Sequence, residues 1–509
     1  MNLFGNMAGL WMLLTLGVLI LTTGLPVWAL LVGVASAIAA AGLATGVMDI
    51  HILQALPART IGLLENDLLQ AMPLYVLMGV LLQRLTVADA LFASLLRLFR
   101  PLGGAHALAA LGVGALIAPT NGSVASSSAL LSRLVAPRVA HLGAAQAVSI
   151  VSVAATIGVV VPPSLVLLLL GDAMLMAHLE ASKLPGYLPV GQRIINTQDV
   201  MHAALLPALC VLLLWALVAW WNTRGLRENT PPRHLNRGQA AIALIAGSTI
   251  VLLLAGVFTG KLFAVEAAAT GGVLLIAFTL ASRSLRLADW TSVCADTLQL
   301  SGALFALLVG ATTFSLVFRL FGTDRWLNSL LLGSTLPPLA TAALILLLVG
   351  LCAWVLDAFE MIFVVVPLVA PVLIARLGDG QQAAVLLLLI LQLSFLIPPM
   401  GYAVLMARAR SGLVLPNRHL LKALWPLLLV QVAVTAVVFA LPQTVHWLDA
   451  PAAVSADAPL SQDDIERQMR EMSGVDALDE TRSGASVDAQ PLPGSSPIRS
   501  QGATRRDGP

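Results

Sequence analysis

The chain carries the same proline-interrupted pattern in both of its halves. Residues 161–164 read Val-Pro-Pro-Ser, and residues 397–400 read Ile-Pro-Pro-Met. A Leu-Val-Ala-Pro stretch precedes each proline pair, at 134–137 and at 368–371. Each pair interrupts an apolar run, and because proline lacks the amide donor and clashes with the preceding turn, a helix must open there. Helix breaks at matching positions of two halves indicate a duplicated membrane fold of the transporter type, with the cargo held near the breaks.

The composition predicts a membrane protein. Of the 509 residues, 58% are hydrophobic and 11% are charged, and the mean hydropathy is +0.91. A soluble protein of this length could not bury so much apolar surface, so the fold class is an all-α polytopic membrane protein. The net charge of +2 gives no indication of a nucleic-acid partner. The three cysteines lie in apolar stretches and indicate neither a disulfide framework nor a metal centre.

Both halves predict the same order of segments: three spans, a re-entrant hairpin, a broken span and a final span. The first repeat covers 1–223, with its hairpin at 106–137 and its broken helix at 145–172. The second covers 239–448, with its hairpin at 338–374 and its broken helix at 382–406. Five crossings per half is an odd number, so we expect two inverted repeats. The remaining candidate spans are 8–23, 25–47, 68–84, 201–221, 239–258, 263–281, 298–320 and 423–441.

Basic residues predict the orientation. The linker 224–238 is rich in arginine. Further arginines flank the first hairpin, and two more basic clusters lie at 283–286 and 408–422. Placing these clusters in the cytoplasm puts both termini in the periplasm and lets the first hairpin enter from the cytoplasmic side. The polar segment 449–509 is rich in Asp, Ser, Gly and Pro, and we expect a disordered tail there.

The first hairpin and the first break offer neutral oxygen ligands. The hairpin tip reads Ala-Pro-Thr-Asn-Gly-Ser-Val-Ala-Ser over 118–126, and its hydroxyl and amide groups could contact a sodium ion or a substrate, or serve only in small-residue helix packing. In the broken helix, freed carbonyls of about 156–161 could bind sodium. The helix that starts at Pro163-Ser164 presents a positive dipole end to an anion. A plain proline kink is the alternative.

The second hairpin contains Asp357 and Glu360 inside an apolar stretch. Carboxylates at membrane depth are costly unless paired or solvated, so a functional role is the default. We expect Asp357 to bind sodium or to gate substrate, whereas Glu360 could equally cap or pair locally. Gln392 and Ser394 are the polar groups nearest the second break, and Tyr402 could face substrate or lie in the interfacial belt.

Together these motifs resemble the large membrane subunit, the DctM-like M subunit, of a tripartite ATP-independent periplasmic (TRAP) transporter. The resemblance runs from about residue 8 to 448 and rests on segment 69–79, the tip 121–123, segments 156–164 and 394–399, and Asp357 before Val366-Pro367. The sequence around Gly171-Asp172 and 392–395 is similar to the branch labelled mannitol/chloroaromatic.

The resemblance implies a sodium-coupled elevator-type permease of the bacterial inner membrane that imports an organic acid, such as a dicarboxylate, or a similar small solute. The implied partners are a small four-helix DctQ-like membrane subunit and a periplasmic DctP-like substrate-binding protein. It implies no cofactor apart from Na+ as coupling ion. The sodium-site residues that we expect are Asn121, Gly122, Ser123, Thr156, Gly158, Val161, Asp357, Ser394 and Ile397. The expected substrate contacts are Asn121, Ser123, Ser126, Pro163, Ser164, Glu360, Pro399 and Met400.

Two other functions were weighed. A standalone Na+- or H+-coupled anion symporter of the divalent-anion type would share the inverted fold without a soluble partner. An enzyme would need a convergent set of Ser, His or acidic residues, and the sequence offers none. It also has no phosphate-binding Gly-Lys-Ser/Thr loop, so we expect no ATP hydrolysis by this chain.

Overall fold

The computed structural model describes residues 3–46, 51, 54–121, 123–162, 164–184, 194–225, 237–398, 401–411 and 415–448. Within these ranges the chain is helical and contains no strand. Seven of the described helices are long and apolar enough to cross a bilayer, or up to nine if each of two bent pairs counts as one span. This confirms the expected all-α polytopic class. The tail 449–509 and most of the basic linker, 226–236, lie outside the described residues.

The first half begins with two apolar helices, α1 (Leu3–Thr23) and α2 (Val27–Ala44). Three shorter helices follow, α4 (Ala55–Leu64), α5 (Asp67–Gln70) and α6 (Met72–Arg84). After α6 the chain bends by 67° into the amphipathic helix α7 (Val87–Phe99). The α6–α7 pair therefore consists of a candidate span followed by a helix that runs in a different direction.

The second half repeats this order with one difference. Helices α14 (Arg237–Phe258) and α15 (Ala264–Ser282) correspond to α1 and α2. They are followed by α16 (Leu287–Leu320), a continuous helix of 34 residues, and by the amphipathic α17 (Thr323–Leu332). The span expected at 298–320 thus begins earlier, because no polar interruption like Glu65-Asn66-Asp67 divides it.

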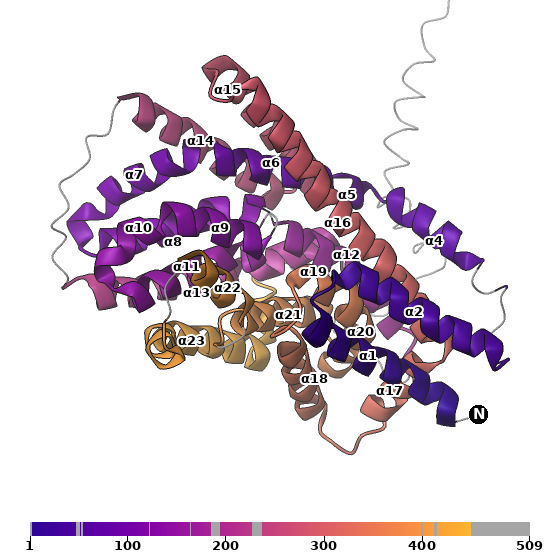
Figure 1. The fold of residues 1–509 in the computed structure, drawn as a ribbon. Coiled ribbons are helices and arrows are strands. Elements are labelled where there is room, and N and C mark those ends of the chain that lie inside the picture. Colours follow the sequence, from indigo (N-terminus) through magenta and orange to yellow (C-terminus); the bar gives the residue numbers. More distant parts are fainter. Residues whose placement is uncertain are drawn as a thin grey trace, which may run out of the picture. The chain divides into compact units, whose positions relative to one another are not determined.

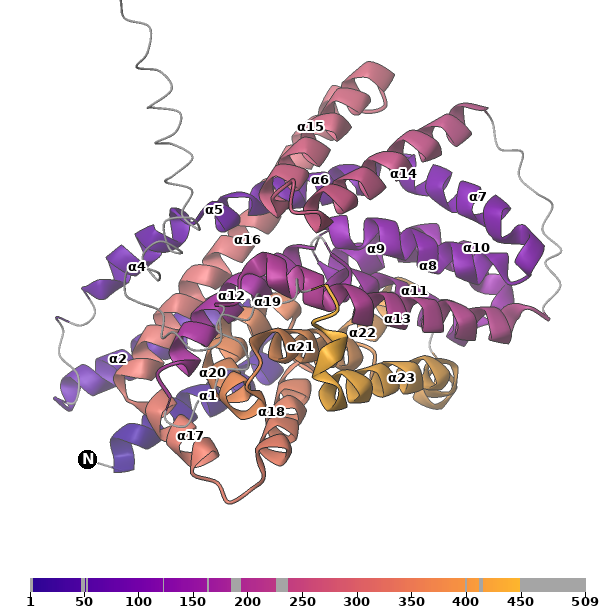
Figure 2. The same cartoon turned by 180° about the vertical axis from the view of Figure 1, so that it is seen from behind.

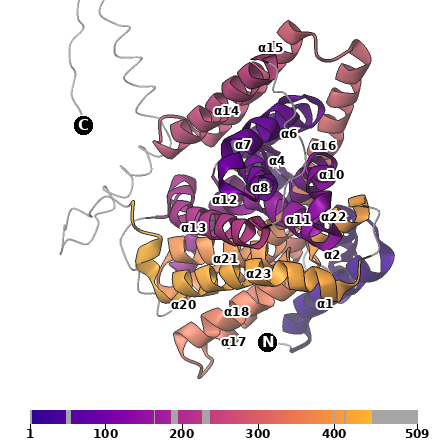
Figure 3. The same ribbon diagram turned by 90° about the vertical axis from the view of Figure 1, so that its left-hand side faces the viewer.

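The two halves exchange their first helices. α1 and α2 pack against α16 and α17 of the second half, whereas α14 and α15 pack against α6 and α7 of the first half (Figures 1 and 3). Figure 2 shows from behind that the hairpins and broken helices lie between these two outer pairs. Because each half completes the other, residues 1–448 form one compact unit.

The segments expected to form the hairpins and the broken helices consist of the following helices. The first hairpin is α8 (Ala105–Ile117) with α9 (Val124–Leu134) and α10 (Ala136–Val139), and the first broken helix is α11 (Ala144–Val160) with α12 (Leu165–Ala181). The second hairpin is α18 (Pro338–Cys352), α19 (Ala358–Glu360), a π-helical turn Met361–Val365 and α20 (Val366–Leu377). The second broken helix is α21 (Gly380–Ser394) with α22 (Tyr402–Ser411).

Small residues set how closely each hairpin approaches its broken helix. A Cβ atom added at Gly114 would lie 2.7 Å from the Ala154 carbonyl oxygen, and one added at Gly350 would lie 3.3 Å from Ile390 Cγ2. Gly350 and Ile390 each follow their first-half counterparts by 236 residues. The same close approach therefore recurs at the same positions of both halves.

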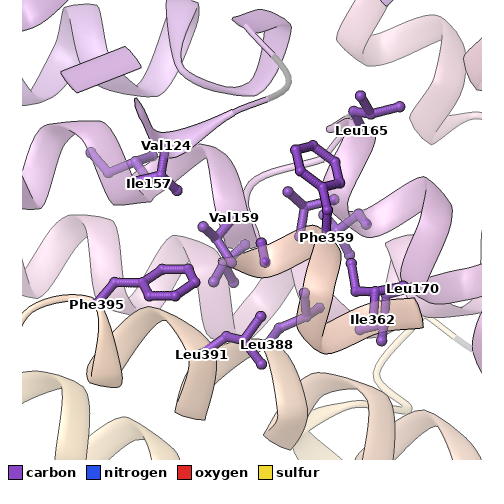
Figure 4. Packing of buried hydrophobic residues seen from close by; sticks show 14 of the residues in the cluster. Val124, Ile157, Val159, Leu165, Leu170, Phe359, Ile362, Leu388, Leu391 and Phe395 are labelled. Carbon is purple, nitrogen blue, oxygen red and sulfur yellow. The ribbon is translucent and has the colours of Figure 1, made fainter. Parts of the chain in front are cut away.

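The core sits where both hairpins meet both broken helices. Figure 4 shows Val124, Val159, Phe359 and Leu388, one from each of these segments, in a single packed cluster. Two long helices, α13 (Thr197–Thr223) and α23 (Asn417–Ala440), pack beside it and are joined by a hydrogen bond from Trp215 Nε1 to the Leu427 carbonyl oxygen at 2.9 Å. The helix breaks are thus held within a packed interior.

Candidate functional site

A cavity of about 740 Å³ lies where the two hairpin tips meet helices α6 and α16. Ser123 and Ser126 line it from the first hairpin, and Asp357 and Glu360 line it from the second. Tyr402, the first residue of α22, also lines it. Four of the residues expected from the sequence are therefore brought to one cavity although they come from opposite halves of the chain.

The first hairpin tip is ordered by its hydroxyl groups. Ser123 is the N-cap of α9, and its Oγ accepts a hydrogen bond from the Ser126 amide at 3.5 Å. Gln83 of α6 donates through Nε2 to Ser126 Oγ at 2.5 Å, and its carbonyl accepts from Arg133. Gln83 thus ties the hairpin tip to a helix of the neighbouring layer. Nothing in the local sequence around Gln83 indicates this partner, which lies 43 residues away.

The second hairpin tip is a reciprocal cap. Asp357 Oδ1 accepts from the Ala358 amide at 2.7 Å, and Glu360 Oε2 accepts from the Asp357 amide at 3.1 Å. Glu360 therefore caps locally, as one of the two sequence interpretations had it, and it also borders the cavity. Both carboxylates are half-buried, and neither forms an ion pair with an arginine or lysine among the described residues. The tip thus presents two carboxyl groups without an arginine or lysine partner in the part of the chain that the structure describes.

The first break is shorter than the sequence indicated. Helix α11 continues to Val160, and only at Val161 does the backbone become extended, with φ −81° and ψ 118°. The stretch of freed carbonyls expected from 156 onward begins at Gly158, because the Ile157 carbonyl still accepts from the Val161 amide at 3.0 Å, whereas Pro162 has no N–H to donate to the Gly158 carbonyl. Ser164 caps α12 by accepting from the Leu167 amide at 3.1 Å, and the next residue, Leu165, lines the cavity. The N-terminus of α12 thus starts at the cavity wall.

Gly158 lies against the first hairpin. A Cβ atom there would fall 2.5 Å from the carbonyl carbon and oxygen of Ala118 and 2.9 Å from the Pro119 nitrogen. No side chain fits without moving that backbone. The position therefore allows a close approach between helix and hairpin tip, a role that a sequence alone does not distinguish from ion contact.

The second break is stabilised by the hairpin beside it. The Ile397 carbonyl oxygen accepts from Trp354 Nε1 at 2.8 Å and from the Gly401 amide at 2.9 Å. Ser394 is buried at the end of α21. The carbonyl of Ile397, expected as a sodium ligand, thus already has two donors.

Several expected residues do not line the cavity or cannot be placed. Thr156, Gly158, Val161, Ser164, Ser394 and Ile397 lie in the broken helices around it and are absent from its wall. The backbone of Asn121 ends a 3-10 turn, Pro119–Asn121, but its side chain lies outside the described part. Gly122, Pro163, Pro399 and Met400 also lie outside the described residues.

A buried amide bridge joins the two broken helices. Gln392 of α21 donates through Nε2 to the Thr156 carbonyl oxygen of α11 at 3.2 Å. Its Oε1 accepts from Gln431 Nε2 of α23 at 2.8 Å, and Gln431 also donates to the Leu389 carbonyl oxygen at 3.2 Å. All three side chains at Thr156, Gln392 and Gln431 are fully or almost fully buried. Sequence reasoning noted Gln392 and missed Gln431, whose only signal was an amide in an otherwise apolar helix.

The bridge has a bearing on the repeat. Thr156 and Gln392 are 236 residues apart, the same spacing as the first prolines of the two breaks, Pro162 and Pro398. Two equivalent positions can touch each other only if they lie close to the axis that relates the two halves. The direct contact therefore places any such axis between α11 and α21.

A second cavity, of about 610 Å³, lies at the other end of α16. Asp296 borders the first cavity and Arg319 borders the second, and 23 residues of one helix separate them by about 35 Å. Arg319 forms an ion pair of 3.0 Å with Glu180 of α12. Asp172 of α12 is hydrogen-bonded to the side chain of Asn66. The two cavities thus open toward opposite ends of the longest helix.

Cationic side chains border the first cavity as well. Arg84 pairs with Asp296, while Arg133 and Arg410 line the wall and are solvent-exposed. The sequence interpretation used Arg133 and Arg410 only as topology signals, because their convergence from α9 and α22 depends on the tertiary fold. The cavity therefore combines hydroxyls, three carboxylates and a guanidinium rim.

Comparison with known proteins agrees with this arrangement. Residues 13–444 match the model of the DctM component of the tripartite ATP-independent periplasmic transporter. The chain is 24% identical over 392 residues to the sialic acid TRAP transporter large permease protein SiaM of Vibrio cholerae, covering 75% of this chain and 86% of that protein. It is 22% identical over 381 residues to the isethionate TRAP transporter permease protein DctMQ of Oleidesulfovibrio alaskensis, covering 74% of this chain and 57% of that longer protein.

A solved structure shares the fold. The Alcanivorax borkumensis YdaH transporter superposes with a TM-score of 0.57 at 17% identity, covering 79% of this chain and 90% of that one. At this identity the likeness concerns the fold alone.

Proposed function

The chain belongs to the DctM family of tripartite ATP-independent periplasmic transporters, so it is a TRAP-type permease and a multi-pass inner-membrane protein; from this we propose that it couples solute import to sodium by an elevator mechanism. Its relatives are transporter permeases, not enzymes. One observation carries the proposal. The two hairpin tips, one with hydroxyl groups and one with two carboxylates, meet in a single cavity beside both helix breaks.

The second hairpin tip suits a monovalent cation. Asp357 is half-buried and has no cationic partner among the described residues, so a bound cation would offset the cost of its charge. Sodium prefers hard oxygen ligands, and Asp357 and Ser394, with carbonyls near the breaks, supply them at the second tip. At the first tip the corresponding set is Asn121, Gly122, Ser123, Thr156, Gly158 and Val161. A sodium ion bound at the first tip would provide positive charge, which would let an anionic substrate approach the protein.

The rest of the cavity suits an organic acid. Arg133 and Arg410 on its wall can pair with a carboxylate or sulfonate, and guanidinium groups bind such anions in a bidentate manner. The N-terminus of α12, which starts at Ser164 beside the wall, adds a positive dipole end. The substrate contacts that we propose from the described residues are Ser123, Ser126, Ser164 and Glu360. Pro163, Pro399 and Met400, at the two breaks, remain proposed contacts.

Alternating access follows from the two cavities. Along α16 the first is lined from Asp296 to Leu307 and the second from Leu308 to Arg319, so they lie on consecutive parts of the same helix. We assign the hairpins and broken helices to the moving body and α1, α2, α6 and α14–α16 to the scaffold. In the proposed orientation both termini are periplasmic, and the 740 Å³ cavity opens to the cytoplasm because Arg84, Arg133 and Arg410 surround it.

The proposed partners follow from the family. In this proposal a small DctQ-like membrane subunit braces the scaffold, and a DctP-like periplasmic protein delivers the solute. The relatives' names support transport of sialic acid and isethionate by those proteins, and both solutes are organic anions. The substrate of this chain is proposed only at that level.

Uptake by proteoliposomes tests the proposal. The permease is reconstituted with its small membrane subunit, and uptake of sialic acid, isethionate and succinate is measured with and without the binding protein under a sodium gradient. We expect uptake of an organic acid to require the sodium gradient and the binding protein together. Arg410→Gln should raise the KM for the transported anion, whereas Arg325→Gln, an exposed charge loss on α17, should leave it unchanged.

Two results would contradict this function. Uptake by the permease alone, driven by a proton gradient, would favour the standalone anion symporter. Uptake whose KM is insensitive to Arg410→Gln would remove the guanidinium rim from the substrate site.

A further inference from the structure

An apolar groove of about 400 Å³ lies between α6, α14 and α15, and Thr120 of the first hairpin tip also lines it. Its volume falls in the range of about 300–1,000 Å³ in which small ligands are bound. It is bordered by Tyr75 and Met78 of α6, Thr249 and Ile245 of α14, and Leu274 of α15. Ile245 is 60% exposed and Leu274 is 47% exposed, so the groove is open along its outer side.

The sequence explains why this groove exists. The corresponding interface, between α2 and α16, is filled: Leu31 is fully buried there, Val34 is 6% exposed, and Gly310 lets the α2 backbone come close. At the positions 236 residues later, α15 carries Ala267 and Thr270. Smaller or polar side chains thus replace two large apolar ones, and protein atoms leave the α6–α15 interface incompletely filled.

The groove lies at the depth of the hydrocarbon core. α14 and α15 are both candidate spans with only 22% and 28% of their apolar windows buried inside the protein. Their outer faces expose Leu244, Leu252 and Val273 by 64% or more. An apolar surface of this kind in a membrane is covered by acyl chains, because water does not reach it.

One end of the groove is basic. Phe278 and Ala281 of α15 line it, so it reaches the last turn of that helix, and Arg283 follows directly as the C-cap. Arg286 begins the next helix. Both guanidinium groups are exposed, and neither is in an ion pair among the described residues. Arg84, at the same end of α6, is already paired with Asp296, and Asp289 accepts from the Arg286 amide at 2.9 Å.

We propose that this groove binds an anionic phospholipid, with an acyl chain between α6 and α15 and the headgroup phosphate against Arg283 and Arg286. Apolar lining at hydrocarbon depth, continued by two unpaired arginines at one end, matches the two parts of such a lipid. The lipid supplies the volume that Ala267 leaves empty at the position equivalent to Leu31. It thereby stiffens the contact by which α14 and α15 hold α6, the helix whose Gln83 contacts the first hairpin tip.

Thermal unfolding of the purified, delipidated full-length protein tests this. Phosphatidylglycerol or phosphatidylcholine is added at equal mole fraction in neutral detergent. A ligand that binds only the folded protein raises Tm with its concentration. We expect phosphatidylglycerol to raise Tm and phosphatidylcholine to raise it much less. The phosphatidylglycerol effect should be lost in Ala246→Phe, which fills the groove from α14, and in the double variant Arg283→Gln/Arg286→Gln.

Matched controls separate the site from general effects. Leu244→Phe adds bulk to the outer face of the same helix, and Arg325→Gln removes a distant exposed charge. Both should keep the full phosphatidylglycerol effect. If Ala246→Phe does not fold, the double arginine variant carries the test.

Three results would overturn the proposal. The first is equal stabilisation by both lipids, and the second is a phosphatidylglycerol effect that survives the arginine substitutions. The third is crosslinking of a photoreactive residue at Thr249 to the small membrane subunit in place of lipid, since that would make the groove a protein interface.

Discussion

Replacing Gln392 by methionine removes the amide bridge between the two broken helices while keeping an unbranched side chain of similar length. The bridge comprises two hydrogen bonds, one to the Thr156 carbonyl at 3.2 Å and one from Gln431 at 2.8 Å. After the change, Gln431 keeps its bond to the Leu389 carbonyl. The substitution therefore tests the bridge itself and leaves the packing nearly unchanged.

We expect a small loss in the free energy of unfolding and a large loss in the rate of uptake. Hydrogen bonds between membrane helices contribute on average about 0.6 kcal/mol each, and in water-soluble proteins about 1 kcal/mol. Two such bonds give a loss of about 1–2 kcal/mol in the free energy of unfolding. Because the bridge holds α11 next to its break, we expect the rate of sodium-driven uptake to fall by considerably more than this loss of folded protein would explain.

Gln382→Met is the matched control. Gln382 is also a buried glutamine of α21, and its Nε2 donates to the Val438 and Phe439 carbonyls at 2.9 and 3.1 Å, so it likewise makes two bonds to α23. It touches neither break. Unfolding in mixed micelles should show similar losses for both variants, and uptake in proteoliposomes should fall only for Gln392→Met. Equal uptake by the two variants would refute the role of the bridge.

Three further predictions concern the break, the close packing and the ion pair. Replacing Pro162-Pro163 by Ala-Ala should restore a continuous helix and abolish uptake; retention of normal uptake would reduce the break to a kink. Gly158→Ala should cost about 1–3 kcal/mol of stability, since its Cβ would meet the Ala118 carbonyl, whereas Gly17→Ala, with open space around it, should be neutral or stabilising in the same unfolding titration. Glu180→Gln should change the free energy of unfolding by less than about 1 kcal/mol, because the ion pair with Arg319 is partly exposed. A loss above about 2 kcal/mol would show that this ion pair stabilises the fold more than its exposure predicts.

The order of helices was predictable because its signals are local. Apolar runs near the length of a bilayer, proline pairs and polar tips each act on the backbone around them, so apolar helices and their interruptions can be placed from the sequence. Their assignment to re-entrant hairpins and inverted repeats stays a prediction. The start of α16 was placed too late, since the polar residues at its beginning carry no hydropathy signal. The extent of the first break was overestimated, because proline removes donors only from its own preceding turn, and α11 therefore stays helical to Val160.

The site was predictable only in part. Ser123, Ser126, Asp357 and Glu360 stand out as polar groups in apolar stretches, and they share a cavity. Gln83, Arg133, Arg410 and Gln431 acquire their role from neighbours 39 or more residues away, as in the Gln83–Ser126 and Gln392–Gln431 bonds. Such partners depend on tertiary packing, which a single sequence does not specify. The division between ion contact and close packing at Gly158 likewise required the position of Ala118.

The central claim is that the second hairpin tip binds sodium through Asp357. The most direct measurement is thermal unfolding of the purified protein in sodium chloride and in choline chloride at equal ionic strength, with Asp357→Asn measured alongside. An ion that binds only the folded state raises Tm according to its occupancy. The account predicts a sodium-specific rise in Tm that Asp357→Asn lacks. An equal Tm in both salts, or a sodium-specific rise that the variant keeps, would contradict it.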